Sequence, residues 1–395
     1  MLDLQTLPEG FHENPFPHYD RLLRDAPVCA QPDGSVILSR HADLERVYKD
    51  TALFTSDKRV VFAPKFGVDS PLFAHHTTSL VFNDPPLHTR VRRIMSAALA
   101  PRAIQRLEPG LISAVDALLE GLSQDADLIE DFAAQIPIQI IGNLLDIPQA
   151  ERAPLRDWSL AILGALEPTL SPDQMARGNR AVTEFGAYLK QLIAHRRAHP
   201  GDPDTDVLTR LIAGDAQGDL SEVELIQNCI FILNAGHETT TNLIGSALAL
   251  LHDHPGEMAR LRQDPGLIGT AVEEVLRAAS PNQFGNRTVA RDTEIGGVPL
   301  RAGTNLHLCI GAANRDGGVF DAPAVFDIAR KPNRHLAFAG GPHVCVGLTL
   351  ARLEARVALQ RFLAQAPDFR IVSRVQGGRV RFRGYACLRA VLNGA

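Results

Sequence analysis

Apolar residues recur at every third or fourth position through most of the middle of the chain, which is the period of an amphipathic helix. We expect helices where this period is clearest, over residues 87–99, 112–122, 136–145, 182–198 and 221–251. The last stretch has the strongest signals, because Ser221 and Glu224 form the pattern of a capping box and Pro255 lies beyond its end. Further helices are expected after Gly266 through Arg277 and over residues 346–365.

Short β-like runs separated by glycine turns follow the helical part of the chain. They cover residues 288–295, 298–300 and 304–310, and predict a small sheet of hairpins. Near the N-terminus, residues 35–39 predict a strand and residues 41–50 a short helix. No period persists over residues 58–83, which predicts an irregular loop. Its phenylalanines either face a substrate, as in a lid, or simply cover the core.

Composition places the chain among folded globular proteins. Its 395 residues are 45% hydrophobic and 22% charged, and 40 basic against 45 acidic side chains give a net charge of -5. This balance argues against a nucleic-acid partner or attraction to an anionic membrane. The first residues lack the pattern of a signal peptide, and residues 225–251 carry too many polar side chains for a membrane span. We therefore expect a cytoplasmic protein.

Several familiar kinds of site have no sequence support. The G-x-G-x-x-G, G-x-x-x-x-G-K-[ST] and G-x-S-x-G patterns do not occur. His237 and Glu238 begin an H-E-x-x-H zinc motif, but position 241 is Thr241 rather than the second histidine. We expect the remaining histidine pairs to be solvated surface residues: His75, His76, His252 and His254.

One cysteine stands out from the other four. Cys345 lies between glycines just before a predicted helix, where unpaired N–H groups and the helix dipole would stabilise a thiolate able to hold a soft metal. The glycines would let the backbone approach something large and flat. The scattered remaining cysteines, without any C-x-x-C spacing, are interpreted as small buried apolar residues: Cys29, Cys229, Cys309 and Cys387.

The stretch around Cys345 resembles the haem-binding loop of the cytochrome P450 family, in which a cysteine thiolate is the axial iron ligand. The residues that carry the resemblance are Phe338, Gly341, His343, Cys345 and Gly347. Ala339 stands where the family usually has glycine. The resemblance implies haem b (iron protoporphyrin IX) as cofactor, held by this loop, with Cys345 as the metal ligand.

A polar sequence inside the long predicted helix also resembles this family. Ala235 and Gly236 correspond to the small residues of the oxygen-binding groove, and Glu238 with Thr239 corresponds to its acid–alcohol pair. The resemblance implies that Thr239 hydrogen-bonds bound dioxygen and that Glu238 delivers protons with solvent. Alternatively, Thr239 and the following Thr240 bond back to the preceding helical turn.

Two further patterns support the same resemblance. Glu274 and Arg277 match the family's E-x-x-R ion pair, which is structural. Val325 occupies the place of a third, arginine partner, and Arg330 is a candidate substitute. The residues that match the family's haem propionate ligands are His88, Arg92, Arg287 and His343. Arg90 and Arg93 are expected to be solvated or to face a redox partner.

The resemblance implies a mainly α cytochrome P450 fold, a helix-rich triangular prism with a smaller β-rich region. One haem domain would cover residues 1–395, with β-rich parts near 28–60 and 285–312 and helical parts near 87–280 and 346–365. It also implies a monomeric monooxygenase that inserts one atom of O2 into a small hydrophobic substrate. Its electrons would come from a separate ferredoxin, docked near Cys345, where Arg352 and Arg356 supply positive charge.

Two other functions stay open. A peroxide-dependent haem-thiolate enzyme would need no redox partner, and a non-catalytic haem sensor or carrier would need no acid–alcohol pair. The substrate itself is indicated only by candidate apolar and polar contacts. These are Phe62, Phe66, Phe73, Phe82, Phe284, Asn234, Asn282 and Asn286. Each of them could instead be a packing residue.

Overall fold

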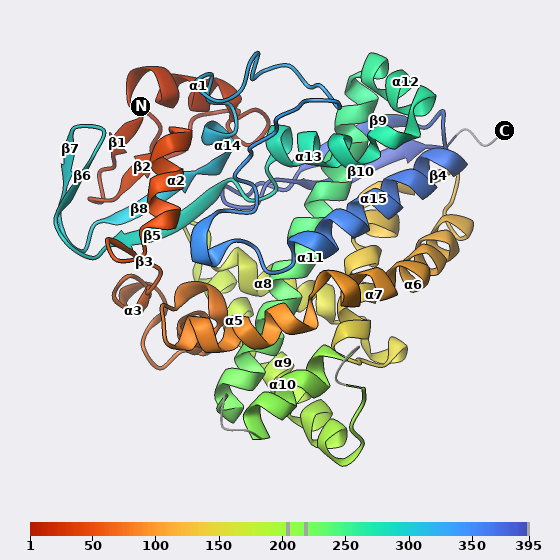
Figure 1. Ribbon diagram of the computed structural model, residues 1–395, viewed down its shortest axis with the longest axis horizontal. Coiled ribbons are helices and arrows are strands. Elements are labelled where there is room, and N and C mark those ends of the chain that lie inside the picture. Colours follow the sequence, from red (N-terminus) through yellow and green to blue (C-terminus); the bar gives the residue numbers. More distant parts are fainter. Residues whose placement is uncertain (203–205, 217–219, 393–395) are drawn as a thin grey trace. The chain divides into compact units, whose positions relative to one another are not determined.

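The computed structural model describes residues 1–202, 206–216 and 220–392 (Figure 1). The chain forms two compact units. Unit 1 comprises residues 1–54, 110–136 and 239–395, and unit 2 comprises residues 55–109 and 137–238. Helices account for most of the regular structure, which confirms the mainly α prediction. The expectation of one haem domain over the whole chain stays a prediction.

The main sheet of unit 1 has the strand order β1-β2-β8-β5-β3. Its strands are β1 (Val28–Ala30), β2 (Val36–Leu38), β3 (Phe54–Thr55), β5 (Phe284–Val289) and β8 (Asn305–Cys309). β2 pairs with β1 antiparallel and with β8 parallel, whereas β5 and β8 are antiparallel. The predicted strand at residues 35–39 is therefore confirmed. The predicted run 288–295 is divided, because the chain bends at residues 290–292 before β6 (Thr293–Ile295).

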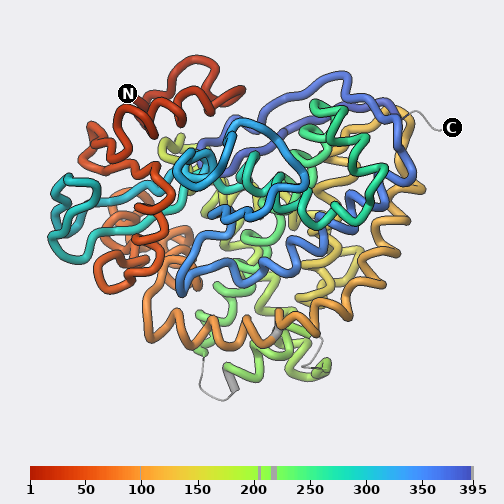
Figure 2. Tube along the Cα trace, turned by 45° about the horizontal axis from the view of Figure 1, so that its top comes forward, coloured from red at the N-terminus to blue at the C-terminus, as the bar shows by residue number. Residues whose placement is uncertain are grey.

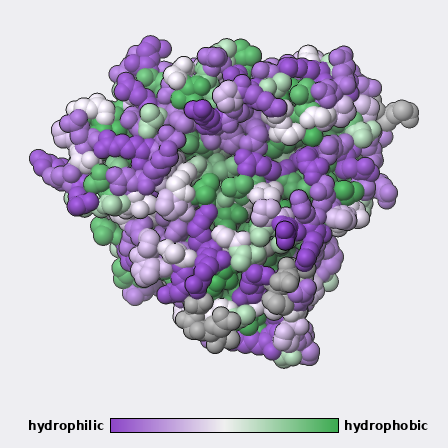
Figure 3. Space-filling view, in the orientation of Figure 1, coloured by the Kyte–Doolittle hydropathy of each residue, from purple (hydrophilic) through white to green (hydrophobic). Residues whose placement is uncertain are grey.

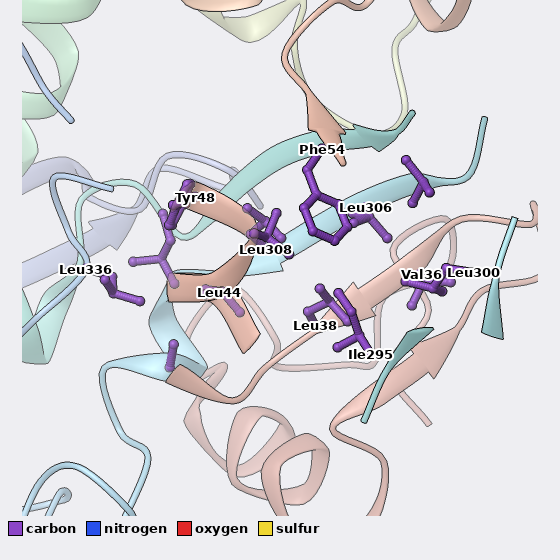
Figure 4. Close-up of a cluster of buried hydrophobic side chains, with 14 residues drawn as sticks. Val36, Leu38, Leu44, Tyr48, Phe54, Ile295, Leu300, Leu306, Leu308 and Leu336 are labelled. Atoms are coloured by element: carbon purple, nitrogen blue, oxygen red, sulfur yellow. The ribbon is translucent and has the colours of Figure 1, made fainter. Parts of the chain in front are cut away.

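A tight hairpin joins β6 to β7 (Val298–Leu300), as the glycine turn predicts. Gly296 and Gly297 both have positive φ, at 57° and 79°, which glycine adopts without strain. The hairpin contributes Ile295 and Leu300 to a buried apolar cluster on the main sheet. Figure 4 shows this cluster, in which Leu44 and Tyr48 of α2 (His41–Lys49) meet side chains of the sheet strands.

A second sheet in unit 1, of order β4-β10-β9, was not predicted. Its strands are β4 (Asp125–Asp127), β9 (Arg370–Gln376) and β10 (Tyr385–Val391). β9 is exposed at most positions, so it lacks the apolar alternation that identifies a strand in a sequence.

Unit 1 also contains further helices and a long connecting segment. The helices are α1 (Phe16–Asp25), α12 (Pro255–Gln263), α13 (Ile268–Ala279), α14 (Ile310–Ala313) and α15 (Leu348–Gln365), with a six-residue π-helix at Leu128–Ala133 and short 3-10 turns at Pro265–Leu267 and Gly341–His343. α13 and α15, which pack on each other, confirm the helices predicted through Arg277 and over residues 346–365. Residues 314–340 connect α14 to the turn before α15 without a regular helix or strand (Figure 2).

The long predicted helix is α11 (Glu222–Asp253), with residues 222–238 in unit 2 and residues 239–253 in unit 1. Its capping box is formed, because Ser221 N–H donates to Glu224 Oε2 at 2.8 Å and Glu224 N–H donates to Ser221 Oγ at 3.2 Å. None of the helices in the described ranges is long and apolar enough to cross a bilayer. Polar side chains cover most of the face in Figure 3.

Unit 2 is a helical unit. Its helices are α3 (Arg59–Phe66), α4 (Pro71–Thr78), α5 (Leu87–Ala98), α8 (Leu155–Gly164), α9 (Pro172–Ala198) and α10 (Val207–Ala216), with short turns at Leu80–Phe82 and Gln149–Glu151. Two more helices contribute to both units, α6 (Pro101–Glu120) and α7 (Gln135–Leu144). The predicted helices at 87–99 and 136–145 are confirmed, whereas those at 112–122 and 182–198 are the C-terminal parts of longer helices.

The expected irregular loop over residues 58–83 is wrong, because α3 and α4 occupy most of it. Both are only eight residues long, Pro64 lies inside α3, and Pro71 begins α4 after the capping residue Ser70. Such short helices have no persistent period, and their prolines read as breaks in a sequence.

Burial corrects one more expectation. His75 and His76 are each only 2% exposed, so they are core residues rather than solvated ones. Phe284, for which packing was the alternative to a substrate contact, packs against Tyr19 with ring centroids 6.0 Å apart, inside a buried apolar cluster. Among the cysteines interpreted as buried, Cys29, Cys229 and Cys309 are buried, and Cys387 is half-buried.

Candidate active site

Cys345 lies in the loop between the turn Gly341–His343 and α15, three residues before the helix begins. Its N–H donates to the carbonyl oxygen of Phe338 at 3.0 Å, which closes the loop on itself. The Cys345 side chain is half-buried. By contrast, burial raises the pKa of the Cys229 thiol to about 12 and the pKa of Cys309 still further, so those thiols stay protonated.

Tyr48 of α2 supports the glycines of this loop. Gly341 has φ 63°, and a Cβ there would collide with the carbonyl oxygen of Tyr48. A Cβ on Gly340 would lie 3.5 Å from Tyr48 Cβ. Ala339, where the family usually has glycine, adopts φ 57° despite its side chain. The close approach of two distant segments therefore requires glycine at 341, and the sequence alone does not reveal Tyr48.

The loop residues fit a flat apolar group with a soft metal at its centre. Residues 335–351 contain no aspartate, glutamate, lysine or arginine, and Phe338, Val344 and Val346 are half-buried beside the thiol. The described residues contain no group of three or more His, Cys, Asp or Glu side chains that could hold a metal ion. A metal bound to Cys345 would therefore take its other ligands from a cofactor, as iron does from a porphyrin.

An ionic network anchors the segment before this loop. Arg277 on α13 donates to both oxygens of Glu274, at 2.8 Å from Nε and 2.7 Å from Nη2. Arg330 Nε donates to the same two oxygens at 3.2 and 3.1 Å. Asn333 Nδ2 and the N–H of Asp327 complete the set of donors, at 3.1 and 3.0 Å. Arg330 therefore replaces the arginine that is missing at position 325.

A second ionic network, which the sequence did not reveal, lies beside the first. Arg352 on α15 donates to both oxygens of Glu273 at 2.7 Å, and His335 Nε2 lies 3.1 Å from Glu273 Oε2. Burial raises the pKa of Glu273, but the hydrogen bonds from Arg352 and His335 outweigh it and hold the pKa at about 2. The Arg352 guanidinium also lies 4.7 Å from the ring centroid of Phe338.

Unit 1 also contains two of the predicted propionate ligands. Arg287 on β5 is 6% exposed, and its guanidinium lies 5.4 Å from the ring centroid of Tyr48. Its Nη1 donates to the carbonyl of Asn286 at 2.7 Å. His343 is half-buried at the end of the turn before Cys345. Tyr48 thus contacts both Arg287 and the glycine loop.

The other two predicted propionate ligands lie on α5 of unit 2. His88 is 2% exposed, and Arg92, one turn later, is half-buried. The neighbouring arginines differ from each other. Arg90 is half-buried and forms an ion pair with Glu224, so it is not simply solvated, whereas Arg93 is exposed.

The predicted oxygen-binding residues lie at the middle of α11. Ala235 is exposed, and Gly236 and Thr239 are half-buried, in a helix whose adjacent residues are mostly buried. Glu238 is 5% exposed. A Cβ on Gly236 would lie 3.1 Å from Ile141 Cδ1, so the small residue permits close packing against α7. His237 is fully buried, which lowers its pKa to about 3 and leaves the imidazole neutral.

The family profile described as "Cytochrome P450" matches residues 161–265 and 266–366. The chain is 35% identical to the biotin biosynthesis cytochrome P450 of Bacillus subtilis (strain 168), over 93% of this chain and 92% of the relative. It is 37% identical to the vitamin D(3) 25-hydroxylase of Pseudonocardia autotrophica, over 91% of this chain and 88% of the relative.

Solved structures give the same result. The crystal structure of P450BioI in complex with hexadec-9Z-enoic acid ligated acyl carrier protein superposes with TM-score 0.91 and 33% identity, over 96% of this chain and 99% of that one. CalO2 superposes with TM-score 0.92 and 30% identity, over 98% of each chain. The chain belongs to the cytochrome P450 family. It is a cytochrome P450 monooxygenase, and the cofactor of this family is haem, iron protoporphyrin IX.

Proposed function

We propose that this P450 inserts one oxygen atom into a small hydrophobic organic substrate, and that Cys345 would bind the haem iron while a separate ferredoxin would donate the electrons. The observation that carries the proposal is the neutral, half-buried cysteine loop, which offers a single soft ligand beside apolar side chains. The curated relatives support a hydrophobic substrate, because one is named for hydroxylation of vitamin D(3).

Bound haem supplies the activation of dioxygen and the transfer of one oxygen atom to the substrate. Cys345 would provide the thiolate ligand, and Phe338 and Gly347 would shape its loop. His343 and Arg287 would hold the propionates of the haem, and the resemblance to the family adds His88 and Arg92 to this set.

The residues of α11 act on the other reactants. Ala235, which is exposed, leaves room beside the helix because its side chain is a single methyl group, whereas Gly236 permits the close approach of Ile141 on α7. Thr239 Oγ1 holds a proton in position, and the Glu238 carboxylate replaces that proton through solvent. Thr239→Ala should therefore reduce the product formed per reductant consumed more than it weakens substrate binding.

Positive charge on α5 and α6 supports an acidic redox partner. Residues 85–107 contain five arginines and no aspartate or glutamate. Arg93, Arg102 and Arg106 are exposed there. Arg352, which the sequence suggested for docking, is held by Glu273, so the arginines of α5 and α6 are the stronger candidates.

The first test is the spectrum of the reduced protein with carbon monoxide. A strongly red-shifted Soret band in the wild type, lost in Cys345→Ala, is the expected result. An unshifted band would refute thiolate ligation. Product formation that needs only hydrogen peroxide would favour the peroxygenase, and a haem protein without product under either condition would favour the sensor or carrier.

A further inference from the structure

A cluster of neutral polar side chains is buried in unit 2 between α4 and α11. His75 and His76 come from α4, and Gln227 and Asn234 come from α11. His75 Nδ1 lies 2.9 Å from Gln227 Oε1, and His75 Nε2 lies 3.2 Å from Asn234 Nδ2. His75, His76 and Asn234 are each 2% exposed.

The hydrogen bonds fix which atoms of the cluster donate. Because Asn234 Nδ2 can only donate, His75 Nε2 accepts, and the His75 Nδ1–H donates to Gln227 Oε1. Burial lowers the pKa of His75 to about 4, so this imidazole is neutral at physiological pH. The amide of Asn234 is thereby held in one orientation.

Two buried polar atoms of the cluster have no hydrogen-bond partner among the described residues. They are Asn234 Oδ1 and His76 Nε2. Leaving such an atom unsatisfied destabilises the folded protein, because the atom has lost its hydrogen bonds to water without gaining a partner. The cost is not a general property of asparagine on this helix, because Asn228 uses both amide atoms: Oδ1 accepts from the Leu80 N–H at 3.0 Å and Nδ2 donates to the Glu224 carbonyl at 2.7 Å.

Three phenylalanine rings lie close to the His76 imidazole. The His76 ring centroid lies 5.4 Å from that of Phe66, 5.7 Å from Phe62 and 5.8 Å from Phe82. Asn234 directly precedes Ala235, the exposed residue at the middle of α11. The nearby cation, Lys65, donates to the Glu167 carbonyl at 2.6 Å. The cluster therefore combines apolar walls with neutral polar atoms.

We propose that Asn234 Oδ1 and His76 Nε2 bind the hydroxyl group of a neutral, otherwise apolar substrate, whose skeleton packs on the phenylalanines around His76. A hydroxyl both donates and accepts, so it can satisfy the amide oxygen and one imidazole nitrogen together. A carboxylate has no proton for Asn234 Oδ1, and its charge would be buried among neutral groups. This assignment of a substrate class rests on the proposed monooxygenase function.

The test compares three ligands that share one alkyl chain: dodecanol, dodecyl methyl ether and dodecanoate. Each is titrated into the haem-loaded ferric protein, and the dissociation constant is read from the shift of the Soret band. We expect the wild type to bind dodecanol about tenfold more tightly than the ether, which corresponds to about 1.4 kcal/mol. Asn234→Leu should abolish this preference and leave the affinity for the ether within about twofold.

His76→Phe is the second variant, because it preserves the aromatic surroundings and removes the nitrogen. Asn228→Leu is the matched control, and it should keep the preference for the alcohol. A wild type without that preference, or an Asn234→Leu variant that retains it, would overturn the proposal. A stronger affinity for dodecanoate would overturn it in favour of an acidic substrate. The red-shifted carbon monoxide band of the same samples reports the proposed function separately.

Discussion

Replacing Arg330 by leucine tests whether this residue completes the network around Glu274. Arg330 donates to both Glu274 oxygens at 3.2 and 3.1 Å, to the Asp321 carbonyl at 2.7 Å and to the Val325 carbonyl at 2.9 Å. Its side chain is 10% exposed, so solvent replaces these bonds poorly.

The expected loss follows from what remains after the substitution. Removing the sole partner of a buried charge costs about 3–5 kcal/mol. Glu274 keeps Arg277, Asn333 and the Asp327 N–H, so its charge is not left unpaired. The loss is then that of several charge-assisted hydrogen bonds, and we expect the free energy of unfolding to fall by about 2–4 kcal/mol.

Urea unfolding followed by circular dichroism measures this change in the haem-loaded protein. Arg301→Leu is the control. Arg301, like Arg330, pairs with a carboxylate, that of Asp292, but its side chain is 85% exposed. That control should lose at most about 0.5 kcal/mol. If Arg330→Leu unfolds at the same urea concentration as Arg301→Leu, the residue does not serve as the missing partner and our reading of the network is wrong.

Three further predictions concern other features of unit 1. Burial raises the pKa of Glu354 from 4.5 to about 8, so the wild type should lose stability as the pH rises from 4.5 to 8. Glu354→Gln should remove this pH dependence, so the two proteins should have equal melting temperatures at low pH and the variant should have the higher one above pH 8. An equal pH dependence of the melting temperature in both proteins would contradict the prediction. Gly341→Ala should cost about 2 kcal/mol or more through its collision with Tyr48, and should speed haem transfer to apomyoglobin. Gly378 also has a positive φ, 65°, but a Cβ there meets no atom within 4 Å, so Gly378→Ala should cost only the backbone strain of about 1 kcal/mol and leave haem transfer unchanged. Glu273→Gln should weaken the hydrogen bonds of residue 273 with Arg352 by about 1–3 kcal/mol and raise the fraction of the carbon monoxide complex with an unshifted Soret band. An unchanged spectrum would show that the Glu273–Arg352 pair does not stabilise the cysteine loop.

The elements that the sequence predicted well are long, and α11 is also clearly capped. α11 begins directly after Ser221 because its cap is local, and the period of α15 continues through 18 residues. The eight-residue helices α3 and α4 were missed because they contain only about two turns each and carry prolines. β9 was missed because its pairing with β10, rather than an apolar face, defines it as a strand.

The candidate site shows the same division between local and tertiary information. Arg330 could be proposed because the sequence placed a valine where a cation was needed, and the structure confirms the substitution. The burial of His75 depends on α4 packing against α11, which no local pattern shows. Tyr48 and Glu273 were not found because their partners lie in remote parts of the chain.

The contact between α2 and the cysteine loop has a consequence for synthesis of the protein. Tyr48 lies against Gly341, and His41 Nε2 lies 2.8 Å from the Arg334 carbonyl, a separation of 293 residues along the chain. At about 5–20 residues per second, a ribosome needs roughly 15–60 s to make the intervening chain. His41 and Tyr48 must therefore remain without these partners until almost the whole chain has left the ribosome. The cysteine loop therefore reaches its final contacts only when synthesis of the chain is almost complete.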